Sequence, residues 1–202
     1  MNVSLTVVSC ATVQAQQLFA NPSLPFHVDV GCARGAFCFD LARSNSNINV
    51  LGIEIRRPLA AHCSKKAREL GMPNVGFVSC NANVDLPAIL QGICAVSRVA
   101  RVSIQFPDPH WKVRHQKRRV VQPGLVAAVA EHCDGDVFLQ SDVLEVAAEM
   151  RRRFRDHASF ADSVDDPAVW INPNPTGVPT EREVATFAKG LPVYRALINR
   201  RA

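Results

Sequence analysis

The stretch from residue 103 to residue 123 joins a rigidly held carboxylate to a dense run of positive charge. An apolar run ends in Phe106, and Asp108 then stands between two prolines, which fix φ and exclude a helix at that point. The permanent cations that follow are Lys112, Arg114, Lys117, Arg118 and Arg119. A fixed carboxylate beside so many cations suits a site that handles a polyanion, and a nucleic acid is the polyanion we expect.

A second stretch, 28–35, has the composition of a cofactor-binding turn and reads VDVGCARG. Its glycines follow an apolar run and precede a helical pattern, so backbone N–H groups there could approach a ligand closely. The dinucleotide pattern G-x-G-x-x-G fails, because Ala33 stands where a pyrophosphate requires the middle glycine. The pattern acidic-x-G-x-G-x-G, from Asp29 through Gly31 to Gly35, fails only at that same alanine. A carboxylate suits the cationic S-adenosylmethionine and would repel a pyrophosphate, so the turn favours that cofactor over NAD.

Polar residues also end the next two apolar runs. Glu54 could accept hydrogen bonds from a ribose diol, and the Asn81-Ala82 pair could contact an adenine edge. Each residue has an ordinary alternative, since Asp29 could favour a helix N-terminus and Asn81 could be a turn residue. Suitable residues at three successive strand ends nevertheless indicate one cofactor site.

The elements that must position these residues follow from alternating apolar runs and helix-period segments. Strands are expected at 26–30, 49–54, 75–80, 99–106, 136–140 and 191–198, and helices at 35–44, 58–70, 117–132 and 142–157, with a shorter one near 85–93. This alternation predicts an α/β fold, a mostly parallel doubly wound sheet with helices on both faces. We expect a lead-in segment over 1–25, one domain over 26–202, and a long irregular loop over 165–180.

Composition narrows the class of protein. A net charge of +5 and a pI near 9.0 agree with an acidic partner without proving one. The seven cysteines include no C-x-x-C pair, which argues against a disulfide framework or a zinc site and for the reducing cytoplasm. No apolar run is long enough to span a membrane. A nuclear or organellar location stays open if the N-terminus is incomplete.

Together these motifs resemble the tRNA (guanine-N7-)-methyltransferase family, whose members are class I S-adenosylmethionine-dependent enzymes. The matching segments are VDVGCARG, LGIEIRR, CNAN, FPDPHWKVRHQKRRVVQP, SDV and PTEREV, in this order over residues 26–198. The FPDP segment with its basic continuation is highly specific, whereas the glycine turn is common to many methyltransferases. The chain departs from the family at Asp29, often a glutamate, at Ala33, usually a glycine, and at Gln105, more often apolar.

The resemblance implies a Rossmann-like sheet with an antiparallel C-terminal strand, and it assigns roles to residues. Asp108 is the implied active-site carboxylate. The implied cofactor-binding residues are Asp29, Gly31, Gly35, Glu54, Arg56, Asn81 and Ala82. The substrate-binding residues are expected to be Lys112, Arg114, Lys117, Arg118, Arg119, Asp142, Thr180, Glu181, Arg182 and Glu183. The implied substrate is a guanosine in the variable loop of tRNA.

The chemistry of guanine N7 limits what Asp108 must do. N7 carries a lone pair and no hydrogen, so methylation there needs alignment with the methyl donor and no general base. A nearby carboxylate could hold the guanine and stabilise the positive charge of the product. A turn-capping aspartate is the plainer interpretation of Asp108, and a non-catalytic RNA-binding module is the rival function.

The remaining expectations concern the surroundings of the site. The basic residues after Asp108 would contact tRNA phosphates, and Trp111 would either stack on a base or pack in the core. The loop 165–180 is a candidate lid over an extruded guanine. We expect no obligate protein partner, although nuclear members of the family use a WD-repeat subunit, and no metal.

Overall fold

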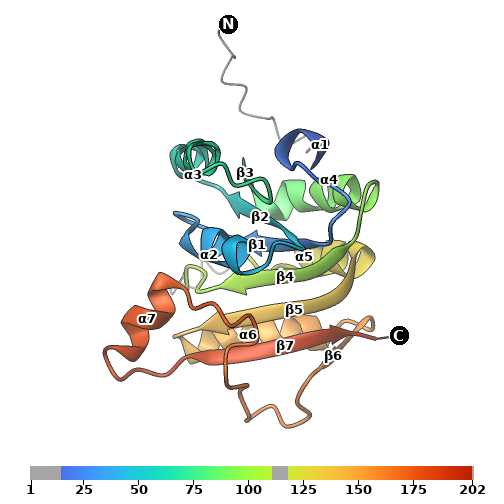
Figure 1. Ribbon diagram of the computed structural model, residues 1–202. Coiled ribbons are helices and arrows are strands. Elements are labelled where there is room, and N and C mark those ends of the chain that lie inside the picture. Colours follow the sequence, from blue (N-terminus) through green and yellow to red (C-terminus); the bar gives the residue numbers. More distant parts are fainter. Residues whose placement is uncertain (1–14, 111–117, 202) are drawn as a thin grey trace, which may run out of the picture.

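The computed structural model describes residues 15–110 and 118–201, and its centre is a seven-stranded sheet. The strand order is β3-β2-β1-β4-β5-β7-β6 (Figure 1). The first five strands run parallel, whereas β7 is antiparallel to both of its neighbours. The strands are β1 Phe26–Val30, β2 Asn49–Glu54, β3 Val75–Ser79, β4 Val99–Gln105, β5 Cys133–Ser141, β6 Phe160–Asp162 and β7 Tyr194–Arg200.

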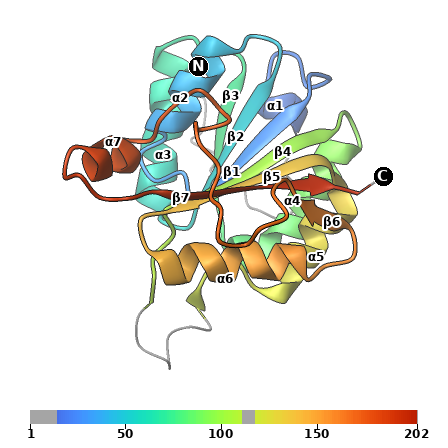
Figure 2. The same cartoon turned by 90° about the horizontal axis from the view of Figure 1, so that it is seen from below.

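Helices cover both faces of the sheet (Figure 2). One face carries α2 (Ala36–Ser44) and α3 (Arg57–Glu69), which enclose a core with Phe39 and Phe77. The other carries α4 (Ala82–Cys94), α5 (Pro123–His132) and α6 (Leu144–Arg155), with the larger core beneath them. The short α1 (Ala15–Leu18) packs against β3, and α7 (Glu181–Phe187) lies beyond the carboxyl ends of the parallel strands (Figure 1).

The central strands form because their apolar runs can be buried on both faces. Every residue of β1 and of β2 is buried, as expected for parallel strands between two helical layers. Proline stands in the first turn of α3 and of α5, where its missing N–H leaves no hydrogen bond unmade. The predicted mostly parallel doubly wound sheet with an antiparallel C-terminal strand is therefore confirmed.

Element boundaries differ from expectation at a few places. The helix expected over 117–132 begins at Pro123, and residues 118–122 form no α-helix. The sequence patterns did not indicate β6 or α7, which have three and seven residues and are too short for a clear period. The lead-in segment contributes to the main core through Ala15 and Phe19.

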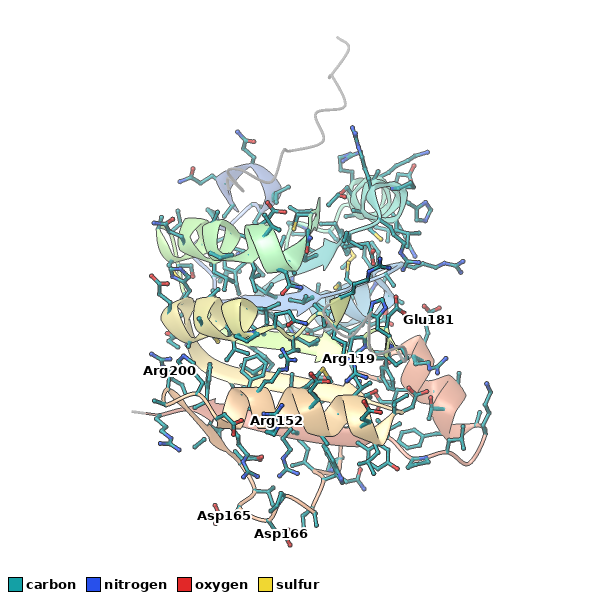
Figure 3. All side chains as sticks on the ribbon, turned by 180° about the vertical axis from the view of Figure 1, so that it is seen from behind. Arg119, Arg152, Asp165, Asp166, Glu181 and Arg200 are labelled. Atoms are coloured by element: carbon teal, nitrogen blue, oxygen red, sulfur yellow. The ribbon has the colours of Figure 1, made fainter. Side chains whose placement is uncertain are left out.

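The loop 165–180 contains no helix or strand but is tied down at its base. The guanidinium of Arg151 donates to backbone carbonyls of residues 164, 166, 167 and 169, and it pairs with Asp162. Asp165 and Asp166 mark the outer bend of this loop (Figure 3). Further along, Val178 packs into the core beside α2. Between these points, the Ile171 N–H donates to the carbonyl of Arg195 and the Asn174 side chain donates to Glu183, and the lid role of the loop stays a prediction.

The sheet places the site at its carboxyl edge. The chain order reverses between β1 and β4, since β2 lies on one side of β1 and β4 on the other. Loops that leave the two strands at such a switch point diverge and open a crevice. Register brings Asp29 of β1 beside Ser103 of β4, two residues before Gln105. The predicted cofactor turn and the Asp108 turn therefore face one another.

Candidate active site

Two hollows open at this edge and share one wall. The first hollow has a volume of about 360 Å³ and is lined by the ends of β1, β2 and β3, including Glu54, Asn81 and Ala82. The second hollow, of about 440 Å³, extends towards α2 and α7. Gly31, Ala33 and the segment 105–108 line both. Asp108 is exposed and borders each hollow, so a group bound in one can reach a group bound in the other at this residue.

The turn after β1 is shaped by three residues in the left-handed backbone region. Gly31 has φ 88°, Ala33 φ 50° and Gly35 φ 71°. A Cβ added at Gly31 would meet no atom within 4 Å, so this glycine leaves open space at the wall of the hollows. A Cβ at Gly35 would lie 2.7 Å from a ring carbon of Phe77, and Gly35 lines neither hollow. Its small size thus serves close packing of α2 against β3, and the expected cofactor contact of Gly35 stays a prediction.

Glu54 holds this turn in place from the end of β2. Its buried carboxylate accepts hydrogen bonds from the backbone N–H of Ala33 at 3.0 Å and of Arg56 at 2.8 Å. The Arg56 side chain adds a third at 3.1 Å, and this contact raises the pKa of the guanidinium. A carboxylate offers roughly four acceptor positions, so one remains for a ligand hydroxyl. The bond to Glu54 fixes Ala33 in a backbone region that costs a non-glycine residue roughly 1–2 kcal/mol.

Asp29 lies behind the turn, buried among hydrogen-bond donors. Its Oδ1 accepts from Ser103 Oγ at 2.6 Å and from Gln105 Nε2 at 3.0 Å, and Oδ2 lies 3.6 Å from Cys38 Sγ. Burial raises the pKa of Asp29, while these three hydrogen bonds oppose that rise. Asp29 is among the residues that line the second hollow and does not line the first. Its contact with Gln105 explains the polar residue that sequence reasoning left unexplained.

Asn81 and Ala82 open α4 and line the first hollow. The Asn81 side chain caps the helix by accepting from the backbone N–H of Asn83 at 3.1 Å, and its own N–H donates to Asp85 at 3.0 Å. The turn role considered for this residue is therefore present, and the same residue faces the hollow. Asn83, Ile55 and Val120 complete this side of the wall.

The Asp108 turn is held at both ends. Phe106 has φ 47°, and its N–H donates to the backbone carbonyl of Gln140 at 2.8 Å. On the other side, Arg119 Nε donates to the carbonyl of Pro109 at 2.9 Å. Since prolines flank Asp108, two tethers are enough to fix the carboxylate where the hollows meet.

Arg119 does not occupy the surface position that the sequence suggested. It is buried, and its guanidinium pairs with Glu145 at 2.8 Å and with Glu149 on α6 (Figure 3). Burial acts to lower the pKa of Arg119, but the hydrogen bonds with both carboxylates outweigh it and raise the pKa. With its donors engaged inside the protein, Arg119 anchors the Asp108 turn to α6 rather than meeting a phosphate. The neighbouring Arg118 is exposed and lines the first hollow.

The C-terminal candidates divide into two groups. Asp142, Thr180, Glu181 and Arg182 line the second hollow, where Arg182 pairs with Asp142 at 2.5–2.9 Å. Glu183 points the other way. It is buried, forms the capping box of α7 with Thr180, and pairs with Arg195 at 2.7 Å. Lys112, Arg114, Lys117 and Trp111 lie outside the described residues.

Arg34 was missed by sequence reasoning, although it lies within the glycine turn. Its exposed side chain lines the second hollow and forms no ion pair with any described residue. The sequence feature that could have indicated Arg34 is its position as the one cation between Gly31 and Gly35. The described residues include no group of three or more His, Cys, Asp or Glu side chains able to hold a metal ion. Of the helices in the described ranges, none combines the length and apolar character needed to cross a membrane.

Comparison with known proteins supplies family evidence for this geometry. Residues 23–196 match a family model described as "Putative methyltransferase". The chain is 47% identical over 183 residues to a tRNA (guanine-N(7)-)-methyltransferase of Microcystis aeruginosa, covering 90% of this chain and 85% of the relative. The corresponding protein of Synechococcus elongatus is 48% identical over 187 residues, covering 92% and 86%.

Solved structures resemble the fold at low sequence identity. The 16S rRNA methyltransferase KamB superposes with a TM-score of 0.64 at 16% identity, covering 95% of each chain. A protein of Streptococcus mutans described as "a putative methyltransferase", solved in complex with SAH, gives a TM-score of 0.52 at 10% identity and 93% coverage of each chain. These structures support the class I methyltransferase fold.

Proposed function

Since the chain belongs to the tRNA (guanine-N7-)-methyltransferase family, we propose that its two hollows hold S-adenosylmethionine and a tRNA guanosine on either side of Asp108. The reaction is methyl transfer from S-adenosylmethionine to N7 of a guanosine, in the variable loop of tRNA. The observation that carries this proposal is the shared wall 105–108, which lets the contents of the two hollows meet at one carboxylate.

The first hollow fits the cofactor. Gly31 leaves open space where a Cβ would intrude, and Glu54 keeps one acceptor position for a ribose hydroxyl. Asn81 and Ala82 border the place for the adenine, while Arg56 steadies Glu54. When bound, S-adenosylmethionine supplies an electrophilic methyl group. Asp29 acts from behind the turn, where its negative charge favours a cationic ligand.

Asp108 positions the guanine and needs to remove no proton. Guanine N7 attacks with its lone pair, so the rate depends on how well the base is held in line. The carboxylate can accept hydrogen bonds from the guanine N1–H and amino group, and its charge offsets the cation that develops on the base. The proline pair and the tethers at Phe106 and Pro109 keep this carboxylate fixed.

The second hollow supplies the substrate side. Arg34 and Arg182 give it exposed positive charge that suits the tRNA backbone, and Thr180, Glu181 and Asp142 offer polar groups near the base. Arg118 extends the cationic surface on the other side of Asp108, and we expect Lys112, Arg114 and Lys117 to continue it. We further propose that the chain acts without an obligate partner subunit. A cytoplasmic location agrees with the reduced thiols of Cys32, Cys38, Cys63, Cys94 and Cys133.

A labelled-methyl transfer assay on unmodified tRNA, followed by nucleoside analysis, tests the proposal. The purified chain should yield 7-methylguanosine, and Asp108→Ala should lower kcat by about 10²-fold or more, the range for losing a transition-state contact. Asp134→Ala, which removes an exposed carboxylate of β5 distant from both hollows, is the matched control. Near-normal turnover in Asp108→Ala, with cofactor binding intact, would show that Asp108 only shapes a turn.

A further inference from the structure

A row of polar side chains crosses the sheet beneath the two hollows. Strand register places Gln105 of β4 beside Gln140 of β5, and Gln140 beside Arg195 of β7. The three side chains therefore share one face, since paired residues on neighbouring strands project to the same side. Gln140 and Arg195 are buried, with 0% and 3% of their surface exposed. Buried polar groups are costly unless each finds a partner, so this row must be connected to be stable.

The hydrogen bonds along the row run in one direction. Arg195 Nε donates to Gln140 Oε1 at 3.1 Å, and Gln140 Nε2 donates to Gln105 Oε1 at 2.7 Å. Gln105 Nε2 then donates to Asp29 Oδ1 at 3.0 Å. Two amides thus link a buried guanidinium to a buried carboxylate, each with its N–H towards the anion. Hydrogen bonds aligned in this way polarise and strengthen one another in a low-dielectric interior.

The far end of the row is attached to the substrate side. Arg195 pairs with Glu183 at 2.7 Å, and the Glu183 carboxylate also accepts from Asn174 at 2.9 Å. Glu183 closes the capping box with Thr180, the residue that enters the second hollow from the start of α7. Gln140 Nε2 lies 3.2 Å from the same carboxylate. The position of α7 and of the loop end at Asn174 therefore depends on the same buried charges.

We propose that Gln105 and Gln140 are positioning residues that couple Asp29, behind the turn after β1, to the Glu183–Arg195 pair beneath the substrate segment. Gln140 lines neither hollow, so its side chain can influence ligand binding only through the residues it holds, which are Gln105 on one side and Glu183 and Arg195 on the other. Through this row, the position of the turn after β1 and the position of the start of α7 depend on each other. This inference rests on the proposed function for the identity of the two ligands.

The plainer alternative is that the two glutamines only fill the interior. Methionine has nearly the same volume and shape as glutamine but neither its donors nor its carbonyl, so Gln→Met separates packing from hydrogen bonding. The affinity for S-adenosylmethionine is measured by calorimetry on the full chain for Gln105→Met, Gln140→Met and the double variant. The KM for tRNA and kcat are measured alongside. Gln91→Met on the exposed face of α4 is the matched control.

Coupling predicts that Gln140→Met weakens cofactor binding about three- to tenfold and raises the KM for tRNA, because one charge-linked hydrogen-bond chain is cut. Gln105→Met should weaken cofactor binding about tenfold, and the double variant should stay within about twofold of the weaker single variant. Unchanged cofactor affinity in Gln140→Met, or a double variant equal to the product of the singles, would overturn the proposal.

A variant with a shorter amide covers the case in which methionine prevents folding. Gln105→Asn keeps the polar group but cannot span Asp29 and Gln140 together, so it should weaken cofactor binding as Gln105→Met does; wild-type affinity in this variant also counts against the coupling. Calorimetry separates this inference from the proposed function. If the chain binds S-adenosylmethionine but methylates no tRNA, the proposed function is refuted. The calorimetry of the glutamine variants still shows whether Gln140 and Asp29 are coupled.

Discussion

Removing the guanidinium of Arg119 should displace the active-site turn without weakening contact with nucleic acid. In Arg119→Met the side chain keeps its length but loses the hydrogen bond to the Pro109 carbonyl and both carboxylate partners. Asp108 stands one residue before Pro109, so the carboxylate loses one of its two tethers. The adjacent Arg118→Met removes an exposed cation from the same basic run and is the natural comparison.

The loss of stability in Arg119→Met depends on how well Glu145 and Glu149 are compensated without the guanidinium. Breaking a buried ion pair costs roughly 3–5 kcal/mol when a charge is left without compensation. Glu145 is 59% exposed and can be hydrated, and Glu149 keeps Arg153 at 2.5 Å. The cost should therefore be nearer about 2 kcal/mol, or roughly 4–8 °C in Tm for a chain of this length. A turn misplaced by about 1 Å can lower the rate by about 10²-fold.

Three measurements on each variant separate anchoring from phosphate binding. Arg119→Met should lose about 30- to 100-fold in kcat and several degrees in Tm, while the dependence of tRNA affinity on salt keeps its slope. Arg118→Met should keep its Tm and reduce that slope by about one, as expected for one lost phosphate contact. If Arg119→Met keeps its kcat and Tm but loses a unit of salt slope, Arg119 binds phosphate and the anchoring argument is wrong.

Three further changes probe the surroundings. Gly31→Ala should weaken S-adenosylmethionine binding at least tenfold, as measured by calorimetry. Gly177 also has a positive φ and open space around an added Cβ, so the control Gly177→Ala should lower stability without changing cofactor affinity. Burial lowers the pKa of His27 from 6.5 to about 3. Between these two pH values, His27 is protonated in the unfolded chain and neutral in the folded one, so acid favours unfolding. Stability should fall as pH drops from about 6.5 towards 3, and His27→Gln should flatten this fall in Tm; an unchanged profile would contradict it. Arg151→Met should expose 165–180 to proteolysis, and equal cleavage rates would refute its role.

Local sequence patterns were sufficient for the main elements of the fold. The expected strands 26–30 and 49–54 coincide with β1 and β2, because buried parallel strands are rich in apolar residues, here Phe26, Val28 and Val30 in β1 and Val50, Leu51 and Ile53 in β2. The turn after β1 and the prolines around Asp108 were also visible locally, since glycine permits a positive φ and proline fixes φ at its own position. Gly31 and Ala33 of this turn line both hollows, as does Asp108, whereas Glu54 lines the first hollow alone.

Roles that depend on distant partners could not be predicted. In the sequence, Arg119 resembles the other cations of its run, and only the fold shows that α6 brings Glu145 and Glu149 to it. The packing of Phe77 against Gly35 is likewise visible only in the structure. The family resemblance of PTEREV implied substrate contacts, but only the fold separates Thr180 in the hollow from Glu183 beneath it.

The chain by itself determined which backbone segments are stiff, which are apolar and which carry charge, since these properties belong to each residue and its near neighbours. Only the tertiary structure decided which polar side chains meet. Gln140 lies 35 residues from Gln105 and 55 from Arg195 along the chain, yet strand register sets the three side by side. Register is fixed by the packing of the whole sheet between its two helical layers, and no local pattern records it.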